Sequence, residues 1–279
     1  RLRKMSYAAG DAITIPEYFQ KRFFTQNPVI RFACAAIIFV FFLIYTASAF
    51  SSGAKLFNYM FGTDYTLSLT IGALIIISYT FLGGFFAVCW TDLIQGLLMF
   101  AALVVVPLVC IIQTPDVSAV QFLNADGAVI SNYLNLFENV NGDIAWTTIL
   151  SGLAWGLGYF GMPHILVRFM SIEKPSMVKK SATVAIIWVI CALGCACLIA
   201  YFGRMFLAEE LLTAGAQKMV FIDFARKLFP SFIAGILMAA IIAASMSTAD
   251  SQLLVASSSF TSDIYKPIIR KDADEKEIL

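Results

Sequence analysis

The sequence predicts an all-α integral membrane protein that crosses the bilayer six times. Hydrophobic residues make up 60% of the 279 residues and charged residues only 13%, whereas soluble domains are about half apolar and a quarter charged. The mean hydropathy is +0.83. A helix of about 20 residues crosses the ~30 Å hydrocarbon layer, and six charge-free windows reach that length. These windows are residues 32–54, 65–91, 93–115, 144–167, 181–203 and 228–249.

The basic residues are distributed unequally between the two sets of loops that six spans create. Fourteen of the 19 lysines and arginines fall in residues 1–31, 87–92 and 168–180 and in the tail from Asp263, and five fall elsewhere. Because cytoplasmic loops carry an excess of Lys and Arg, we expect the first set to face the cytoplasm. Residues 1–28 are then a cytoplasmic N-terminal segment and residues 264–279 a cytoplasmic linker.

Two short amphipathic helices are predicted outside the spans. Pro16 and Glu17 suit the first turn of a helix, where a missing N–H costs nothing and a carboxylate favours the helix dipole. The aromatic residues expected on its membrane-facing side are Tyr18, Phe19, Phe23 and Phe24. A second helix, over residues 217–229, is expected on the outer surface. Its apolar side is expected to consist of Val220, Phe221, Phe224 and Leu228.

The fourth window contains residues that disfavour a continuous helix, because GLGYFGMP places three glycines and a proline within residues 156–163. Each glycine costs roughly 1 kcal/mol and an interior proline about 3 kcal/mol relative to alanine in a helix. One reading is close helix packing through small residues. The other is a discontinuous helix, which membranes tolerate only where the freed backbone lines a cavity. Trp155 and Tyr159, four residues apart, would then share one face beside the break.

Oxygen-bearing side chains gather at the end of the sixth window, in the stretch AASMSTADSQ. Ala244, Ser247 and Thr248 fall on one stripe of a helix, and Asp250 and Ser251 follow. The hydroxyls alone could simply bond back to their own helix. A carboxylate inside a membrane is costly and usually functional, and hydroxyls beside a carboxylate form a hard-oxygen site for a cation.

Two further ionisable residues lie in apolar surroundings. Asp92 stands between the second and third windows and is expected either to cap the third span or to handle a cation. His164 is the only histidine, and a packing role and a role as a proton relay both remain open for it.

Four stretches resemble the sodium:solute symporter family, most closely its sodium/proline branch. They are TIPEYFQKRF, YTFLGGFFAVCWTDLIQ, GYFGMPHILVRFM and MSTADSQLLVASS, in the order of the family. The resemblance implies the inverted-repeat (LeuT-type, five-plus-five helix) transporter fold, with the six spans as core helices three to eight. Because the chain starts at Arg1 and stops in a charged stretch, we expect residues 1–279 to be an internal fragment of a single transporter domain.

The resemblance also implies site residues. The main sodium site of the family corresponds to Ala244, Ser247 and Thr248, and a second sodium or release path corresponds to Asp92, Asp250 and Ser251. In the proline branch, the substrate site corresponds to Tyr45, Trp155, Tyr159 and Pro163. This chain departs from the pattern at Asp250, where relatives with a second sodium carry a hydroxyl, and at Met162, where proline symporters usually carry glutamine.

The function implied by the resemblance is Na⁺-coupled uptake of a small zwitterionic solute, foremost L-proline, across the plasma (inner) membrane by a multi-pass protein. The partners expected are the small-molecule substrate, sodium and the lipid bilayer, without nucleic acid or an obligate protein partner. An enzyme is not expected, because a single histidine without a metal motif offers no catalytic set. Clustered rather than continuous polar residues disfavour a channel. A sensor module fused to a histidine kinase, or symport of another amino acid or a carboxylate, remains the alternative.

Overall fold

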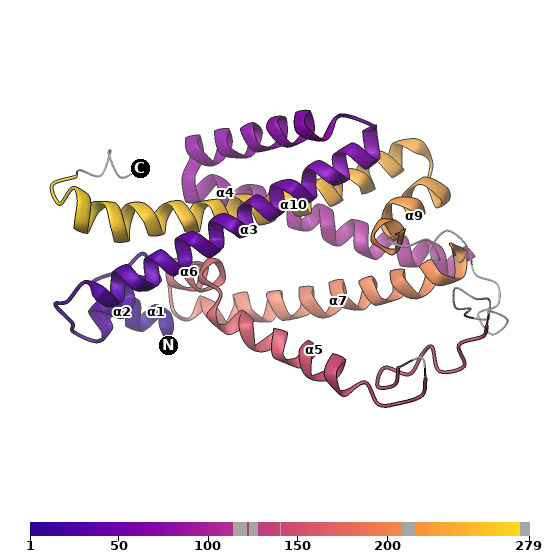
Figure 1. The fold of residues 1–279 in the computed structure, drawn as a ribbon, viewed down its shortest axis with the longest axis horizontal. Coiled ribbons are helices and arrows are strands. Elements are labelled where there is room, and N and C mark those ends of the chain that lie inside the picture. Colours follow the sequence, from indigo (N-terminus) through magenta and orange to yellow (C-terminus); the bar gives the residue numbers. More distant parts are fainter. Residues whose placement is uncertain (114–121, 123–127, 140, 208–215, 274–279) are drawn as a thin grey trace. The chain divides into compact units, whose positions relative to one another are not determined.

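The computed structural model describes residues 1–113, 122, 128–139, 141–207 and 216–273, and these residues are mainly helical (Figure 1). The helices up to the first gap are α1 (Leu2–Ala8), α2 (Ile15–Arg22), α3 (Val29–Phe61) and α4 (Tyr65–Gln113). The next group is α5 (Trp146–Gly158), a 3₁₀ turn (Tyr159–Gly161), α6 (Pro163–Ser171) and α7 (Met177–Phe206). The last group is a 3₁₀ turn (Ala216–Met219), α9 (Val220–Leu228), α10 (Ser231–Phe260) and a π-helix (Thr261–Ile269).

Four helical stretches are long and apolar enough to cross a membrane. In the described part of the chain these are α3 with 33 residues, α4 with 49, α7 with 30 and the continuous stretch Ser231–Ile269 with 39. The protein is therefore an integral membrane protein. The six windows map onto fewer long helices because the second and third both lie on α4, while the fourth is divided between α5 and α6.

The break within α4 occurs at Gly84, where the backbone has φ 52° and ψ −147° and the helix is interrupted. Only glycine adopts this conformation without strain, because it has no Cβ. The expected boundary, at Asp92, is therefore wrong by eight residues. Asp92 lies inside the second helical part of α4, and the interpretation of Asp92 as a helix cap is also wrong.

The fourth window is a discontinuous helix, as the glycines and the proline predict. α5 ends at Gly158, the chain tightens into the 3₁₀ turn, and Met162 is extended with φ −69° and ψ 112° before α6 begins at Pro163. Pro163 is at the first position of α6, where its missing N–H leaves no bond unmade.

α10 continues well beyond the sixth window. The helix runs on to Phe260 and then passes directly into the π-helix. The charge of Asp250 ends the sixth window but does not end the helix. Asp250 and Ser251 are both buried in the middle of the stretch. Residues 264–269 of the expected linker belong to the π-helix, and residues 274–279 lie outside the described residues.

The chain forms two compact units. The first contains residues 1–95, 159–183 and 244–279. In it, α1, α2 and α6 share an apolar cluster that contains Ile15, Tyr18 and Met170. Tyr18 is thus buried, in contrast to its expected place at the membrane surface, whereas Phe23 and Phe24 are exposed.

The second unit contains residues 96–158 and 184–243. Its core joins the later part of α4, α7, α9 and the first part of α10 through a set of buried residues that includes Val106, Phe202, Phe224 and Leu237. The four apolar residues expected on one side of the 217–229 helix all pack into this core. The amphipathic pattern of that segment is confirmed.

Candidate functional site

Two of the three oxygens expected to hold a cation lie next to each other on α10. Thr248 Oγ1 donates a hydrogen bond of 3.0 Å to the carbonyl oxygen of Ala244, one turn earlier. This contact is the bonding to the helix's own backbone that the sequence left open, and for Thr248 it is confirmed. Ala244, Ser247 and Thr248 are all half-buried. Carbonyl and hydroxyl oxygens on one stripe can supply part of a shell around a hard cation.

Ser245, on the same polar stretch, joins α10 to α3. Its Oγ donates to the carbonyl oxygen of Ala49 at 3.1 Å. A Cβ added to Gly53, one turn further along α3, would lie 2.7 Å from the same Oγ. Small residues thus bring the two helices close, as is common between membrane helices, and the position of the α10 hydroxyls is fixed by this contact.

Asp250 is fully buried, and one of its two carboxylate oxygens accepts a hydrogen bond among the described residues. Its Oδ2 accepts a hydrogen bond of 2.6 Å from the hydroxyl of Tyr79 on α4. Its Oδ1 is buried and has no hydrogen-bond donor among the described residues. A buried carboxylate oxygen without a partner carries a desolvation cost, so this atom marks a place where a cation or a donor would stabilise the protein.

Asp92 and Ser251, expected in the same site, are in direct contact. Ser251 Oγ donates to Asp92 Oδ2 at 3.1 Å. The side chain of Asp92 is 9% exposed, and its Oδ1 is buried without a donor in the described part of the chain. Asp92 also interacts electrostatically with Asp250. The structure therefore brings the three residues expected for the second cation path into one cluster.

Arg168 of α6 completes this acidic cluster, and its role was not predicted from the sequence. Its Nη2 donates both to Asp92 Oδ2 and to Ser251 Oγ, the latter at 2.7 Å. The contacts join residues that are 76 and 83 positions apart in the chain. An arginine just after the break in the fourth window is a signal that could have suggested a partner for an acid inside the membrane.

A cavity of about 360 Å³ lies beside this cluster within the first unit. Arg168 and Ser251 line it together with Pro163 and His164. His164 packs on the ring of Phe42, with 5.8 Å between the ring centroids, and its Nδ1 is buried without a partner among the described residues. The ring contact fits the packing interpretation, although this nitrogen is not satisfied, and both the packing role and the proton-relay role of His164 stay predictions.

Three of the four expected substrate residues belong to the first unit, and the fourth, Trp155, belongs to the second. Tyr45 of α3 lies 6.5 Å from Phe42, measured between ring centroids, and Phe42 in turn contacts His164, next to Pro163. Tyr159 lies on the 3₁₀ turn and is 53% exposed. Trp155 is 72% exposed and belongs to the second unit. The aromatic pair therefore stays a prediction, whereas Tyr45 and Pro163 are linked through two rings.

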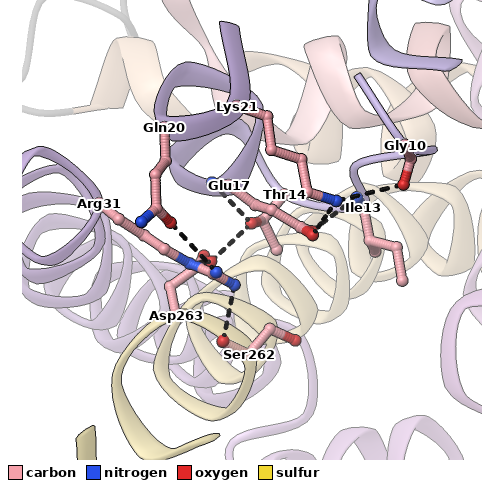
Figure 2. A network of polar contacts seen from close by, with 9 residues as sticks. All are labelled: Gly10, Ile13, Thr14, Glu17, Gln20, Lys21, Arg31, Ser262 and Asp263. Carbon is pink, nitrogen blue, oxygen red and sulfur yellow. Dashed lines mark hydrogen bonds and ion pairs between the residues drawn. The ribbon is translucent and has the colours of Figure 1, made fainter. Parts of the chain in front are cut away.

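A second polar network surrounds Asp263 and was also missed by sequence reasoning (Figure 2). Asp263 is buried, and its Oδ1 accepts from Arg31 Nε at 2.7 Å and from Thr14 Oγ1 at 2.8 Å. Thr14 also caps α2, because its Oγ1 accepts from the backbone N–H of Glu17 at 3.3 Å, while Glu17 accepts from the N–H of Ile13. The cap of Thr14, directly before the first helical residue Ile15, confirms the predicted start of a helix near Pro16.

The Asp263 network also contains a backbone carbonyl. Arg31 Nη2 donates to the carbonyl oxygen of Ser262 at 2.9 Å. One carboxylate therefore connects the cap of α2, the first turn of α3 and the π-helix (Figure 2). A capping box followed by an arginine, and an acid after a long apolar run, were the available sequence signals.

Comparison with known proteins identifies the family of this chain. The family model described as "Sodium:solute symporter family" matches residues 2–279. The osmoregulated proline transporter OpuE of Bacillus subtilis is 40% identical over 279 residues, which cover 100% of this chain and 56% of that protein. The sodium/proline symporters of Haemophilus influenzae and Escherichia coli are 40% and 39% identical, again over 100% of this chain and over 56% and 55% of theirs.

The chain spans about half the length of these curated relatives. The family match extends over residues 2–279, a range that contains the broken helix, the acidic cluster and the hydroxyls of α10. On this basis the chain belongs to the sodium:solute symporter family.

Proposed function

We propose that the full-length protein imports a small zwitterionic solute, L-proline foremost, by symport with sodium across the plasma membrane, and that it catalyses no chemical reaction. The observation that carries the sodium part is that Asp92 Oδ1 and Asp250 Oδ1 are buried carboxylate oxygens without a donor among the described residues. Buried charges are ordinarily paired or bind cations. Sodium is a hard cation that prefers such oxygen ligands. As the transported ion, it could bind first to one of these oxygens and then to the other.

The main sodium site is proposed on the α10 stripe formed by the carbonyl of Ala244 and the hydroxyls of Ser247 and Thr248. The hydrogen bond between Thr248 and Ala244 already places two oxygens 3.0 Å apart. A cation could be ligated by the carbonyl oxygen of Ala244 and the hydroxyl oxygen of Thr248 together, with the hydroxyl proton kept and turned away, because a hydroxyl oxygen has acceptor lone pairs. The cluster of Asp92, Asp250 and Ser251 is proposed as a second cation site or as the release path.

The substrate site is proposed at the break between α5 and α6. Freed backbone groups at helix ends can meet a carboxylate or an ammonium group without adding a formal charge. Trp155 and Tyr159 are exposed aromatic side chains that could pack against a compact ring, with Tyr45 and Pro163 completing the walls. The relatives named as proline transporters favour proline, and the thioether of Met162 favours a pocket somewhat more apolar than theirs.

The architecture proposed is six spans of a five-plus-five inverted-repeat transporter, with residues 1–279 inside one transporter domain. The interruption at Gly84 would separate the second span from the third, and α5 and α6 would form the broken fourth span. Residues 1–28 and 264–279 are proposed to face the cytoplasm because basic residues concentrate there.

The test is uptake by the full-length protein in proteoliposomes. An inward sodium gradient should drive accumulation of labelled L-proline, and a potassium gradient of equal size should not. Unlabelled proline should compete, whereas a sugar should not. Sodium-driven uptake of a carboxylate with no inhibition by proline would overturn the substrate assignment. Absence of sodium-driven uptake of amino acids and carboxylates alike would overturn the symport itself and favour the sensor module.

A further inference from the structure

We propose that Arg168 is a tethered cation that occupies the acidic cluster in the absence of sodium and competes with sodium for it. The inference rests on the proposed function, because it assigns a regulator to the cation site of Asp92, Asp250 and Ser251. The guanidinium of Arg168 and a sodium ion would need the same oxygens.

The contacts show that Arg168 uses ligands that sodium would need. A single nitrogen, Nη2, donates to Asp92 Oδ2 and to Ser251 Oγ at once. Ser251 Oγ in turn donates to Asp92 Oδ2. The hydroxyl is therefore both donor and acceptor already. While Arg168 is in place, the carboxylate oxygens of the cluster that have no partner among the described residues, and so remain to bind sodium, are Oδ1 of Asp92 and Oδ1 of Asp250.

The oxygens that Arg168 already contacts favour one cation at a time. Asp92 and Asp250 are two acids, and Arg168 is the one base whose ion pair with either of them is seen in the described chain. A sodium ion on the same oxygens would stand within a few ångströms of the guanidinium. Two positive charges so close to each other repel. Sodium binding and departure of Arg168 are therefore coupled.

Arg168 is also able to leave. Its side chain is 42% exposed although it touches a carboxylate that is 9% exposed. It lines the cavity of about 360 Å³, which gives the guanidinium a place to go. Its pairing uses one nitrogen rather than the two-pronged geometry that makes arginine–carboxylate pairs strong. A permanent structural pair would be expected to be more enclosed and to use both prongs.

Because Arg168 lies on α6, its position would couple the binding of the substrate to the binding of sodium. α6 is nine residues long and starts at Pro163, directly after the extended Met162. A ligand bound beside Pro163 would act on the same short helix that carries the arginine. Substrate binding that shifts α6 would then change the competition for sodium, which is a coupling free energy between two sites.

The experiment compares Arg168→Gln, Arg168→Lys and Arg168→Gln/Asp92→Asn with wild type in the full-length protein. Sodium binding to purified protein without turnover is followed by the rise in melting temperature with sodium concentration, and uptake is measured in parallel. If the site is not occupied by Arg168 in about one wild-type molecule in ten, Arg168→Gln should lower the half-saturating sodium concentration about tenfold. Arg168→Lys, which keeps the charge, should fold and give a smaller decrease. Adding Asp92→Asn should abolish the gain.

The control is Arg22→Gln, which removes the same charge from an exposed position in the last turn of α2. It should leave the sodium dependence unchanged. If Arg168→Gln folds and binds sodium as wild type does, or more weakly, the competition is refuted while sodium-driven uptake by wild type still supports the proposed function. If Arg168→Gln does not fold and Arg168→Lys shows wild-type half-saturation, the arginine is a structural pair and the inference is equally refuted. If no protein responds to sodium, both proposals fall.

Discussion

Replacing Asp263 with asparagine tests how much the network in Figure 2 stabilises the first compact unit. The change keeps the size of the side chain and removes its charge, so it leaves no cavity. It weakens two contacts of the same oxygen, one from Arg31 Nε at 2.7 Å and one from Thr14 Oγ1 at 2.8 Å. The expected cost therefore depends on what the guanidinium of Arg31 can do without the carboxylate.

Breaking a buried ion pair by removing one partner typically costs 3–5 kcal/mol, as an order of magnitude. Here the cost should be smaller, because Arg31 keeps 18% of its side-chain surface exposed and retains the carbonyl of Ser262 and the amide oxygen of Gln20 as acceptors. We expect Asp263→Asn to lower the free energy of unfolding by about 2 kcal/mol, in the range of a hydrogen bond to a charged group. That corresponds to a factor of roughly thirty in the ratio of folded to unfolded protein.

The measurement is reversible unfolding of the full-length protein in mixed micelles, with a double-mutant cycle against Arg31→Gln. The matched control is Asp11→Asn, because Asp11 also pairs with an arginine, Arg3 at 2.9 Å, but is 65% exposed. Asparagine tolerates the positive φ of Asp11, so the control should cost less than about 1 kcal/mol. Equal costs at the two positions, or no coupling between Asp263 and Arg31, would refute the argument from burial.

Three further predictions concern the site and the helix contact beside it. Thr248→Ala should raise the sodium concentration for half-maximal uptake about tenfold at unchanged protein abundance, and an unchanged sodium dependence would remove Thr248 from the cation site. Tyr159→Ala should weaken inhibition by unlabelled proline, whereas Phe160→Ala, a neighbouring exposed aromatic on the same turn, should not; equal effects would contradict a specific contact. Gly53→Ala should lower the melting temperature because its Cβ would lie 2.7 Å from Ser245 Oγ. Adding Ser245→Ala should restore part of the loss. No restoration would show that the close approach of the two helices here is unimportant.

Local signals in the sequence predicted the parts of the fold that depend on local backbone chemistry. The break before Pro163 was visible because glycine and proline act on their own segment. The start of α2 was visible for the same reason, since Glu17 and its cap are three residues apart. The sequence predicted the interruption of α4 at Asp92 and not at the glycine pair of residues 83 and 84, because a charge usually ends an apolar span, whereas Asp92 is accommodated inside the helix by its contacts with Arg168 and Ser251.

The partners of the buried acids were not predictable in this way. Tyr79 and Asp250 are 171 residues apart, and Arg168 and Asp92 are 76 residues apart. A tyrosine inside a predicted span fits plain packing equally well, so nothing in its neighbourhood indicates a carboxylate partner. The sequence indicates that these acids are costly inside a membrane, but only the tertiary structure determines which side chains contact them.

The Asp263 network has a consequence for biosynthesis. Thr14 and Arg31 are 249 and 232 residues ahead of Asp263. At synthesis rates of about 5–20 residues per second, the N-terminal part waits roughly 10–50 s for this partner. During that interval we expect Arg31 to act as a free positive charge next to α3, of the kind that holds a helix end in the cytoplasm. Once residue 263 is made, the same guanidinium becomes a buried partner. One arginine would thus first orient a helix in the membrane and later fasten the segment in front of it.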